Sequence, residues 1–265
     1  MHTEISSLIP RRSLAAGLAL ALSLPLAAGL AWLGPWSPRT LARADQLAQQ
    51  QRVDEALETY GLAADWAVTP TQRADALFRA GQLAATTQNP QLAVAALRRA
   101  TREHPQDPRT PDALARLGEV LARDLSRPER GALAYQQASE TSSPRTAEYC
   151  LRGAELRLQA DQPQRAWQAY ETCAKTHPDS AHQAWLAMAN IKLSVGDVRG
   201  AARLFERVTK TGAMGETLAL AQLGASVTHE RLGDYQAVLA ELSHSDLSPE
   251  LQGRRRERVV ERESR

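Results

Sequence analysis

The hydrophobic positions between residue 40 and about residue 246 follow the three- and four-residue spacing of amphipathic helices separated by short polar turns. The clearest stretch is residues 93–105, where Ala93, Leu97, Ala100 and Pro105 lie at offsets 0, 4, 7 and 12. The first three side chains share one helix face, and the proline ends the helix. No segment is rich in strand signals, so the pattern predicts an all-α protein.

The same offsets recur along the chain, which predicts a repeat array. The matching sets are Ala56, Tyr60 and Ala63; Gly131, Tyr135 and Ala138; Ala166, Tyr170, Cys173 and Pro178; and Ala201, Phe205 and Val208. The first members of the five sets lie 37, 38, 35 and 35 residues apart. This interval predicts stacked helix pairs, so we expect residues 40–246 to form one solenoid of five to six units.

Turn residues support this division into units. Gly196 and Gly233 are each followed by aspartate in the same inter-helix turn, where glycine accepts a left-handed backbone and aspartate caps the next helix. Gly81 and Ala93 are expected to be small because the two helix backbones approach closely where they cross. The third unit contains one extra residue, which we expect in the turn around residues 125–128.

A repeat of about 34 residues with Ala, an aromatic residue or Leu, Ala and then Pro resembles the tetratricopeptide repeat (TPR) family. The resemblance covers residues 40 to about 246. It implies antiparallel helix pairs in a right-handed superhelix, with the first helices lining a concave groove that binds peptides or partner helices. The arrangement is also similar to bacterial inner-membrane proteins with periplasmic repeats, including translocon-associated chaperones.

The resemblance assigns groove positions to each first helix. They are Asp75, Phe78 and Gln82; Asp112, Ala115 and Glu119; Glu148, Leu151 and Glu155; and Gln183, Leu186 and Asn190. This set is acidic and apolar and lacks the basic residues with which some TPR proteins bind a carboxylate. We therefore expect the groove to take an amphipathic or basic protein segment, with ordinary solvated helix faces as the alternative.

Residues 13–33 form an uncharged run of 21 residues, long enough to span a bilayer. Arg11 and Arg12 precede it, and Trp32 and Trp36 lie at its far end, which predicts a short cytoplasmic segment at residues 1–12 and an extracytoplasmic body. Residues 34–39 contain two prolines and are expected to be a linker. We expect a single-pass protein of a bacterial inner membrane with a periplasmic body.

Three other interpretations of the N-terminus remain open. Residues 29–31 offer small side chains to a signal peptidase, which would release a soluble periplasmic protein. The pair Arg11-Arg12 also loosely resembles a twin-arginine export signal. An inverted topology would instead give a cytosolic adaptor tethered to the membrane.

Charge and motifs exclude several functions. A net charge of +2 gives no reason to expect nucleic acid as a partner. The chain contains no phosphate-binding glycine loop, HExxH, CxxC or GxSxG motif, so we expect no catalytic residue, cofactor, metal or small-molecule substrate. His104 and His177 each precede the closing proline of a unit and are expected to be polar turn residues. The basic segment 247–265 is expected to be a capping helix or a solvated tail.

Cys150 and Cys173 are expected to be neighbours, since they lie near facing ends of an antiparallel helix pair. We expect two small, buried apolar side chains. The alternative is a disulfide, worth roughly 3 kcal/mol, if the body lies in an oxidising compartment.

Together these features predict a non-catalytic, membrane-anchored scaffold that holds partner proteins in its groove. The rival from another class is an assembly or regulatory subunit of an envelope complex, such as polysaccharide export or cytochrome maturation.

Overall fold

The computed structural model describes residues 38–234, 236–238 and 249–263. Every regular element in these ranges is helical, and they contain no strand, which confirms the predicted all-α class. The predicted membrane helix at residues 13–33 lies outside the described ranges. Within them, no helix is both long enough and apolar enough to cross a membrane.

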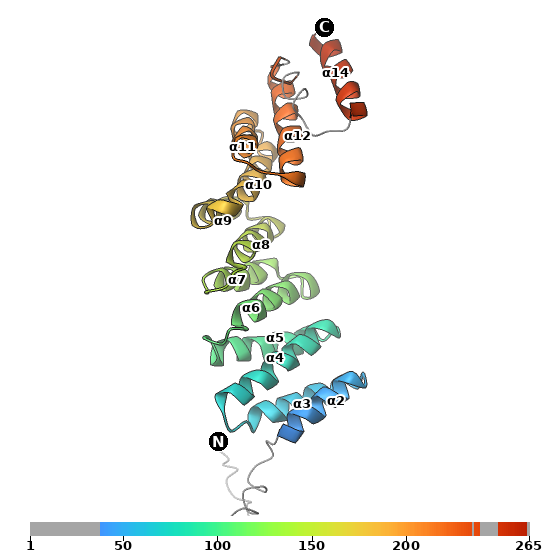
Figure 1. Ribbon diagram of the computed structural model, residues 1–265, viewed down its shortest axis with the longest axis vertical. Helices are drawn as coiled ribbons and strands as arrows, with labels where there is room; N and C mark the ends of the chain where they lie inside the picture. Colours follow the sequence, from blue (N-terminus) through green and yellow to red (C-terminus); the bar gives the residue numbers. More distant parts are fainter. Residues whose placement is uncertain (1–37, 235, 239–248, 264–265) are drawn as a thin grey trace, which may run out of the picture.

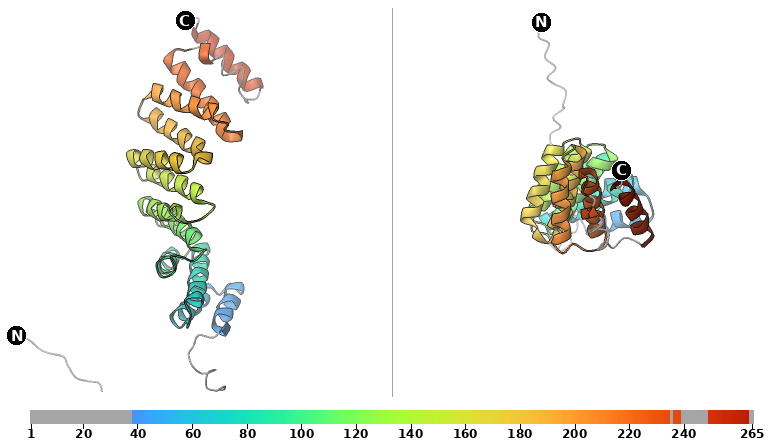
Figure 2. Two further views of the ribbon diagram at one scale, coloured as in Figure 1. Left: turned by 60° about the vertical axis from the view of Figure 1, so that its left-hand side comes forward. Right: turned by 90° about the horizontal axis from the view of Figure 1, so that it is seen from above.

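The helices stack along one long axis, from α2 near the N-terminus to α14 at the opposite end (Figure 1; Figure 2). They are α2 (Pro38–Gln49), α3 (Val53–Asp65), α4 (Pro70–Thr86), α5 (Pro90–Glu103), α6 (Thr110–Glu119), α7 (Pro128–Ser139), α8 (Thr146–Gln159), α9 (Pro163–Thr176), α10 (Ala181–Ser194), α11 (Val198–Lys210), α12 (Gly215–Leu232) and α14 (Pro249–Glu263). The main contacts join helices that are neighbours or next neighbours in sequence, which confirms a helical-hairpin solenoid.

The positions that define the repeat pattern form the core. In α5, Ala93, Leu97 and Ala100 are 0%, 2% and 0% exposed. The equivalent side chains of α3, α7, α9 and α11 are also buried. Each second helix therefore turns its small–large–small face toward its neighbours, as the sequence predicts.

Two helix backbones approach closely at the crossing of α6 and α7. A Cβ atom at Gly118 would lie 2.9 Å from the carbonyl oxygen of Gly131, and one at Gly131 would lie 2.7 Å from the carbonyl oxygen of Gly118. At Gly81 the space is filled by a side chain instead, because a Cβ there would lie 2.6 Å from Cδ2 of Leu97. Close backbone approach therefore explains the glycines at the α6–α7 crossing of the third repeat. At Gly81 in the second repeat, the atoms nearest to an added Cβ belong to the Leu97 side chain.

The extra residue of the third repeat lies in a helix rather than in the turn around residues 125–128. Residues Val120–Asp124 form a π-helical segment that continues α6, and the amide of Leu125 donates to the carbonyl oxygen of Val120, five residues back, at 3.1 Å. The wider turn absorbs one residue without breaking the helix, as π-bulges do. The predicted location was therefore wrong.

Each helix pair is joined by a turn with one residue in the left-handed region. These residues are Gln51 (φ 60°), Gln88 (φ 59°), Ser126 (φ 52°), Asp161 (φ 55°), Gly196 (φ 80°) and Gly233 (φ 75°). The side chains of Asp197 and Asp234 accept from the amides of Gly200, at 2.8 Å, and Ala237, at 3.1 Å. The predicted Gly-Asp turn is confirmed, and the structure extends the same conformation to four positions that lack glycine.

The C-terminal end continues the stack only in part. α12 is the first helix of the predicted sixth unit, and most of its second helix lies outside the described ranges. The basic segment contains α14, in which Val259 is 1% exposed. Both interpretations of this segment, a capping helix and a solvated tail, stay predictions.

Candidate partner-binding groove

The predicted groove residues lie on four successive first helices. α4 contains Asp75, Phe78 and Gln82, and α6 contains Glu119. α8 contains Leu151 and Glu155, and α10 contains Leu186 and Asn190. Four of them, Phe78, Gln82, Leu151 and Glu155, line two pockets.

The first pocket, which we call the central pocket, lies between α8 and α10 and has a volume of about 500 Å³. It brings together two predicted groove residues, Leu151 and Glu155, with Glu148 and Gln183, which hold equivalent positions. Tyr135 of α7 and Tyr170 of α9 complete the wall. Burial raises the pKa of both phenols, so both stay protonated at neutral pH.

The second pocket, which we call the N-terminal pocket, lies between α4 and α6 and has a volume of about 540 Å³. Phe78 and Gln82 line it together with Asp112 and two arginines, Arg109 and Arg116. Asp75 lies beside it as the ion-pair partner of Arg109. Glu119, Leu186 and Asn190 line neither of these two pockets.

The predicted acidic character of the groove is wrong, because arginines neutralise its carboxylates. Glu119 accepts from Arg116 at 2.6 Å, and Glu155 accepts from Arg152 at 2.5 Å. The two arginines occupy equivalent positions three residues before the glutamates. Sequence reasoning missed them because it counted only three positions on each first helix. The arginine–glutamate spacing of three residues was the signal that could have identified them.

Two further arginines link successive repeats across the groove. Arg109, just before α6, donates to Asp75 of α4 at 2.5 Å, and its guanidinium carbon lies 4.5 Å from the centre of the Phe78 ring. Arg145, just before α8, likewise reaches Asp112 of α6 at 2.9 Å. Phe78 is therefore covered by a cation and is 7% exposed.

The bridging arginine is absent at the next junction, where the central pocket lies. Ser180, just before α10, occupies the equivalent position and lines this pocket. Glu148 consequently has no partner from α10 and accepts two hydrogen bonds from Arg145, both at 2.9 Å. These hydrogen bonds lower the pKa of Glu148. The serine carries no charge, so no arginine spans the space between α8 and α10.

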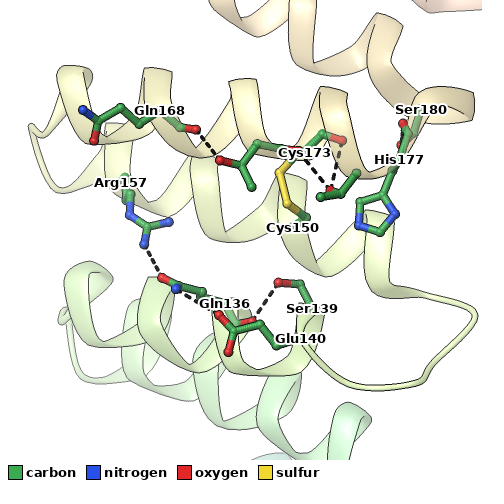
Figure 3. Close-up of a disulfide and its surroundings, with 11 residues drawn as sticks. Gln136, Ser139, Glu140, Cys150, Arg157, Gln168, Cys173, His177 and Ser180 are labelled. Atoms are coloured by element: carbon green, nitrogen blue, oxygen red, sulfur yellow. Dashed lines mark hydrogen bonds between the residues drawn. A yellow bond between two sulfur atoms is a disulfide. The ribbon is translucent and has the colours of Figure 1, made fainter.

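Cys150 of α8 and Cys173 of α9 form a disulfide, with their Cα atoms 5.7 Å apart (Figure 3). The structure therefore contains the disulfide alternative instead of the two thiols that we expected. The bond joins the two helices of the fourth repeat. Among the described residues, no group of three or more His, Cys, Asp or Glu side chains is placed to hold a metal ion.

Comparisons with known proteins agree with this architecture. Residues 41–108 and 78–146 each match the tetratricopeptide repeat family model, so this part of the chain carries tetratricopeptide repeats. The described helices downstream continue the same stack. No curated protein matches the chain.

Solved structures share the fold at low sequence identity. A tetratricopeptide repeat protein from Parabacteroides merdae is 16% identical, with a TM-score of 0.51, over 70% of this chain and 72% of that one. MamA is 16% identical, with a TM-score of 0.49, over 64% of this chain and 88% of that one. PilF from Pseudomonas aeruginosa is 17% identical, with a TM-score of 0.46, over 78% and 88%.

Proposed function

We propose that this protein is a non-catalytic scaffold that binds a segment of a partner protein in its groove, with the central pocket as the main contact. The observation that supports this assignment most is the interruption of the arginine bridges at Ser180. Elsewhere along the groove, Arg109 and Arg145 bridge neighbouring first helices. Between α8 and α10 no such bridge crosses the pocket, which is lined by aliphatic, aromatic, polar and charged groups.

The chemistry of the central pocket favours an amphipathic partner segment. Leu151 is half-buried and Tyr135 and Tyr170 lie in the wall, so an apolar side chain of the partner would displace water from them. Glu148 and Glu155 already pair with arginines, so a purely basic segment would gain little from them. We therefore narrow the expectation from an amphipathic or basic segment to an amphipathic one.

We further propose that the body is extracytoplasmic and held at a bacterial inner membrane by residues 13–33. The sequence arguments for this topology are the uncharged run and its flanking arginine and tryptophan residues. The Cys150–Cys173 disulfide supports it, because disulfides persist in oxidising compartments. A cleaved periplasmic form would differ in mature mass and in membrane partition, and both are measured directly on a gel after fractionation.

Site-specific crosslinking in intact membranes tests the partner-binding role. A photocrosslinking residue at Gln183, which is exposed in the central pocket, is expected to capture a defined partner band. The same residue at Gln164, exposed on α9 outside the pocket, is the matched control. Leu151→Asp should abolish the Gln183 band, since it places a charge on the apolar wall. Equal bands from both positions, or a band insensitive to Leu151→Asp, would refute the proposal.

A further inference from the structure

A third pocket, outside the groove, lies where α7, α8 and α9 meet, and we call it the outer pocket. Its volume is about 590 Å³. Its lining includes Gln136 of α7 and Glu140 directly after it, Cys150 and Arg157 of α8, and Gln168 of α9 (Figure 3), together with Arg165 of α9. A pocket of this size accommodates a small organic molecule rather than a bare ion.

The guanidinium of Arg157 is half-buried in this pocket without a counter-charge. Its Nη2 donates to Oε1 of Gln136 at 2.6 Å. No carboxylate of the described residues forms an ion pair with Arg157 or with Arg165. Burial, and then the positive charge of Arg165, lower the pKa of Arg157. The two positively charged guanidinium groups of Arg157 and Arg165 therefore line the same pocket.

The one carboxylate in the wall, that of Glu140, is engaged elsewhere. Nε2 of Gln136 donates to Oε1 of Glu140 at 3.1 Å, while Oε1 of Gln136 accepts from Arg157. The amide of Gln136 therefore lies between the guanidinium and the carboxylate. Glu140 keeps its hydrogen-bond partner, and Arg157 keeps an uncompensated charge.

The arginines of the groove, in contrast, are paired. Arg109, Arg116, Arg145 and Arg152 each form an ion pair with a carboxylate between 2.5 and 2.9 Å away. Leaving a partly buried charge unpaired opposes folding, whereas an opposite charge offsets this cost. Partly buried charges without a counter-charge are typical of ligand sites. In the outer pocket the missing negative charge is therefore the feature that a ligand would supply.

The disulfide links two of the helices that form the wall of the outer pocket. Arg157 lies on α8 and Arg165 on α9, and the Cys150–Cys173 bond joins these two helices. Cys150 itself forms part of the wall. A covalent link between the helices limits how far their backbones can separate, which reduces the ordering that binding of a ligand would require.

We propose that the outer pocket binds the carboxylate or phosphate group of a small organic ligand, with Arg157 and Arg165 as the two binding residues. The planar guanidinium presents paired donors that match both kinds of oxyanion. Gln168, at the rim, lies where it would contact the rest of the ligand. This site is separate from the partner-binding groove, and its ligand differs in class from the protein segment proposed there.

Isothermal titration calorimetry on the full-length chain in a non-ionic detergent tests the proposal. The probes are O-phosphoserine, citrate and inorganic phosphate. We expect saturable binding of O-phosphoserine or citrate that is tighter than binding of inorganic phosphate. Arg157→Gln and Arg165→Gln should each weaken it about tenfold or more, as expected for the loss of a charge-assisted hydrogen bond. Arg203→Gln, which removes an exposed charge from α11 outside the pocket, should leave the affinity unchanged.

Three results would overturn the proposal. The first is the absence of saturable binding by all three probes. The second is equal affinity of the probes for Arg165→Gln and for the unaltered chain. Arg165 is exposed, so this variant is expected to fold even if the half-buried Arg157 is needed for folding. The third is inorganic phosphate binding as tightly as the organic probes, which would exclude contacts to an organic ligand.

Discussion

At the scale of single residues, two glycines in helix interiors lie in opposite surroundings. Gly118 of α6 faces the backbone of Gly131 at the helix crossing, whereas no atom lies within 4 Å of a Cβ built at Gly61 of α3. Alanine gains about 1 kcal/mol over glycine from helix propensity at either site. Only at Gly118 does it also create a clash with a backbone atom that cannot rotate away.

We therefore expect the two alanine variants to change stability in opposite directions. Gly118→Ala should lower the free energy of unfolding by about 1–2 kcal/mol, because overpacking outweighs propensity. Gly61→Ala should raise it by up to about 1 kcal/mol. Urea unfolding followed by circular dichroism measures both. A stabilised Gly118→Ala would show that the α6–α7 crossing yields more easily than its contacts indicate.

Tyr149 provides a test of alkaline stability. Burial, and then the hydrogen bond to Asp112, raise its pKa to about 12. A free tyrosine titrates near pH 10. Because the folded value is the higher one, Tyr149 contributes stability below pH 10 that is lost as the pH rises from about 10 to 12.

Tyr149→Phe should therefore lower the free energy of unfolding at pH 8 but not at pH 12. The cost at pH 8 is about 1 kcal/mol, for one lost hydrogen bond. Urea unfolding of both proteins across this pH range gives the difference directly. A difference that stays constant with pH would mean that the phenol titrates alike in the folded and unfolded chains.

The groove could be predicted from the sequence only in part. The repeat register predicted the helices that contain Leu151 and Glu155, and the structure places both side chains in the central pocket. It did not predict neutralisation of the carboxylates, because the pairing depends on arginines outside the three groove positions considered. The outer pocket had no sequence signal, since Gln136, Arg157 and Arg165 come from three helices and meet only through packing.

At the scale of elements, the inter-helix turns repeat one strained position. Gln88 joins α4 to α5 with φ 59°, a conformation that costs a residue with a side chain about 1–2 kcal/mol. Its side chain is exposed, so replacing it sacrifices no packing. Gly196 and Gly233 meet the same backbone requirement without this cost.

Gln88→Gly should therefore stabilise the chain by about 1 kcal/mol. Gln82→Gly is the matched control, because Gln82 is exposed in the interior of α4 and glycine should cost about 1 kcal/mol there. Thermal unfolding of the two variants should shift in opposite directions. Shifts of the same sign would contradict the left-handed turn at Gln88.

The disulfide stabilises the fourth helix pair by linking residues 23 positions apart. Replacing both cysteines with serine should cost about 3 kcal/mol, mainly because the unfolded chain regains freedom. Adding a reductant to the unaltered protein should have a similar effect, and the double variant should not respond to it. Intact mass after alkylation without reductant checks the bond, since two added alkyl groups would exclude it.

The existence of the elements was predictable, but one detail of their geometry was not. Small and large side chains at offsets 0, 4 and 7 identify buried helix faces because packing requires them there. The extra residue of the third repeat shifts the register by one position. The shift is the same whether the residue lies in a longer turn or in a wider helical turn. Only the hydrogen bond from Leu125 to Val120 distinguishes the two.

At the scale of the whole molecule, each helix pair is stabilised chiefly by the pairs beside it. A lesion in one repeat should therefore remain local. In Gly118→Ala, amide hydrogen exchange is expected to accelerate in α6, α7 and their immediate neighbours and to stay unchanged in α11 and α12. Uniform acceleration along the chain would show that the stack unfolds as one cooperative unit.

The order of contacts along the stack also affects how the chain is made. Because packing partners lie close in sequence, a helix pair needs only about one further repeat of roughly 34 residues to complete its surroundings. Short separations also keep the entropy of loop closure small and folding fast. The N-terminal repeats are therefore able to close while later ones are still inside a ribosome or an export channel, and little bare hydrophobic chain is exposed at any moment of synthesis.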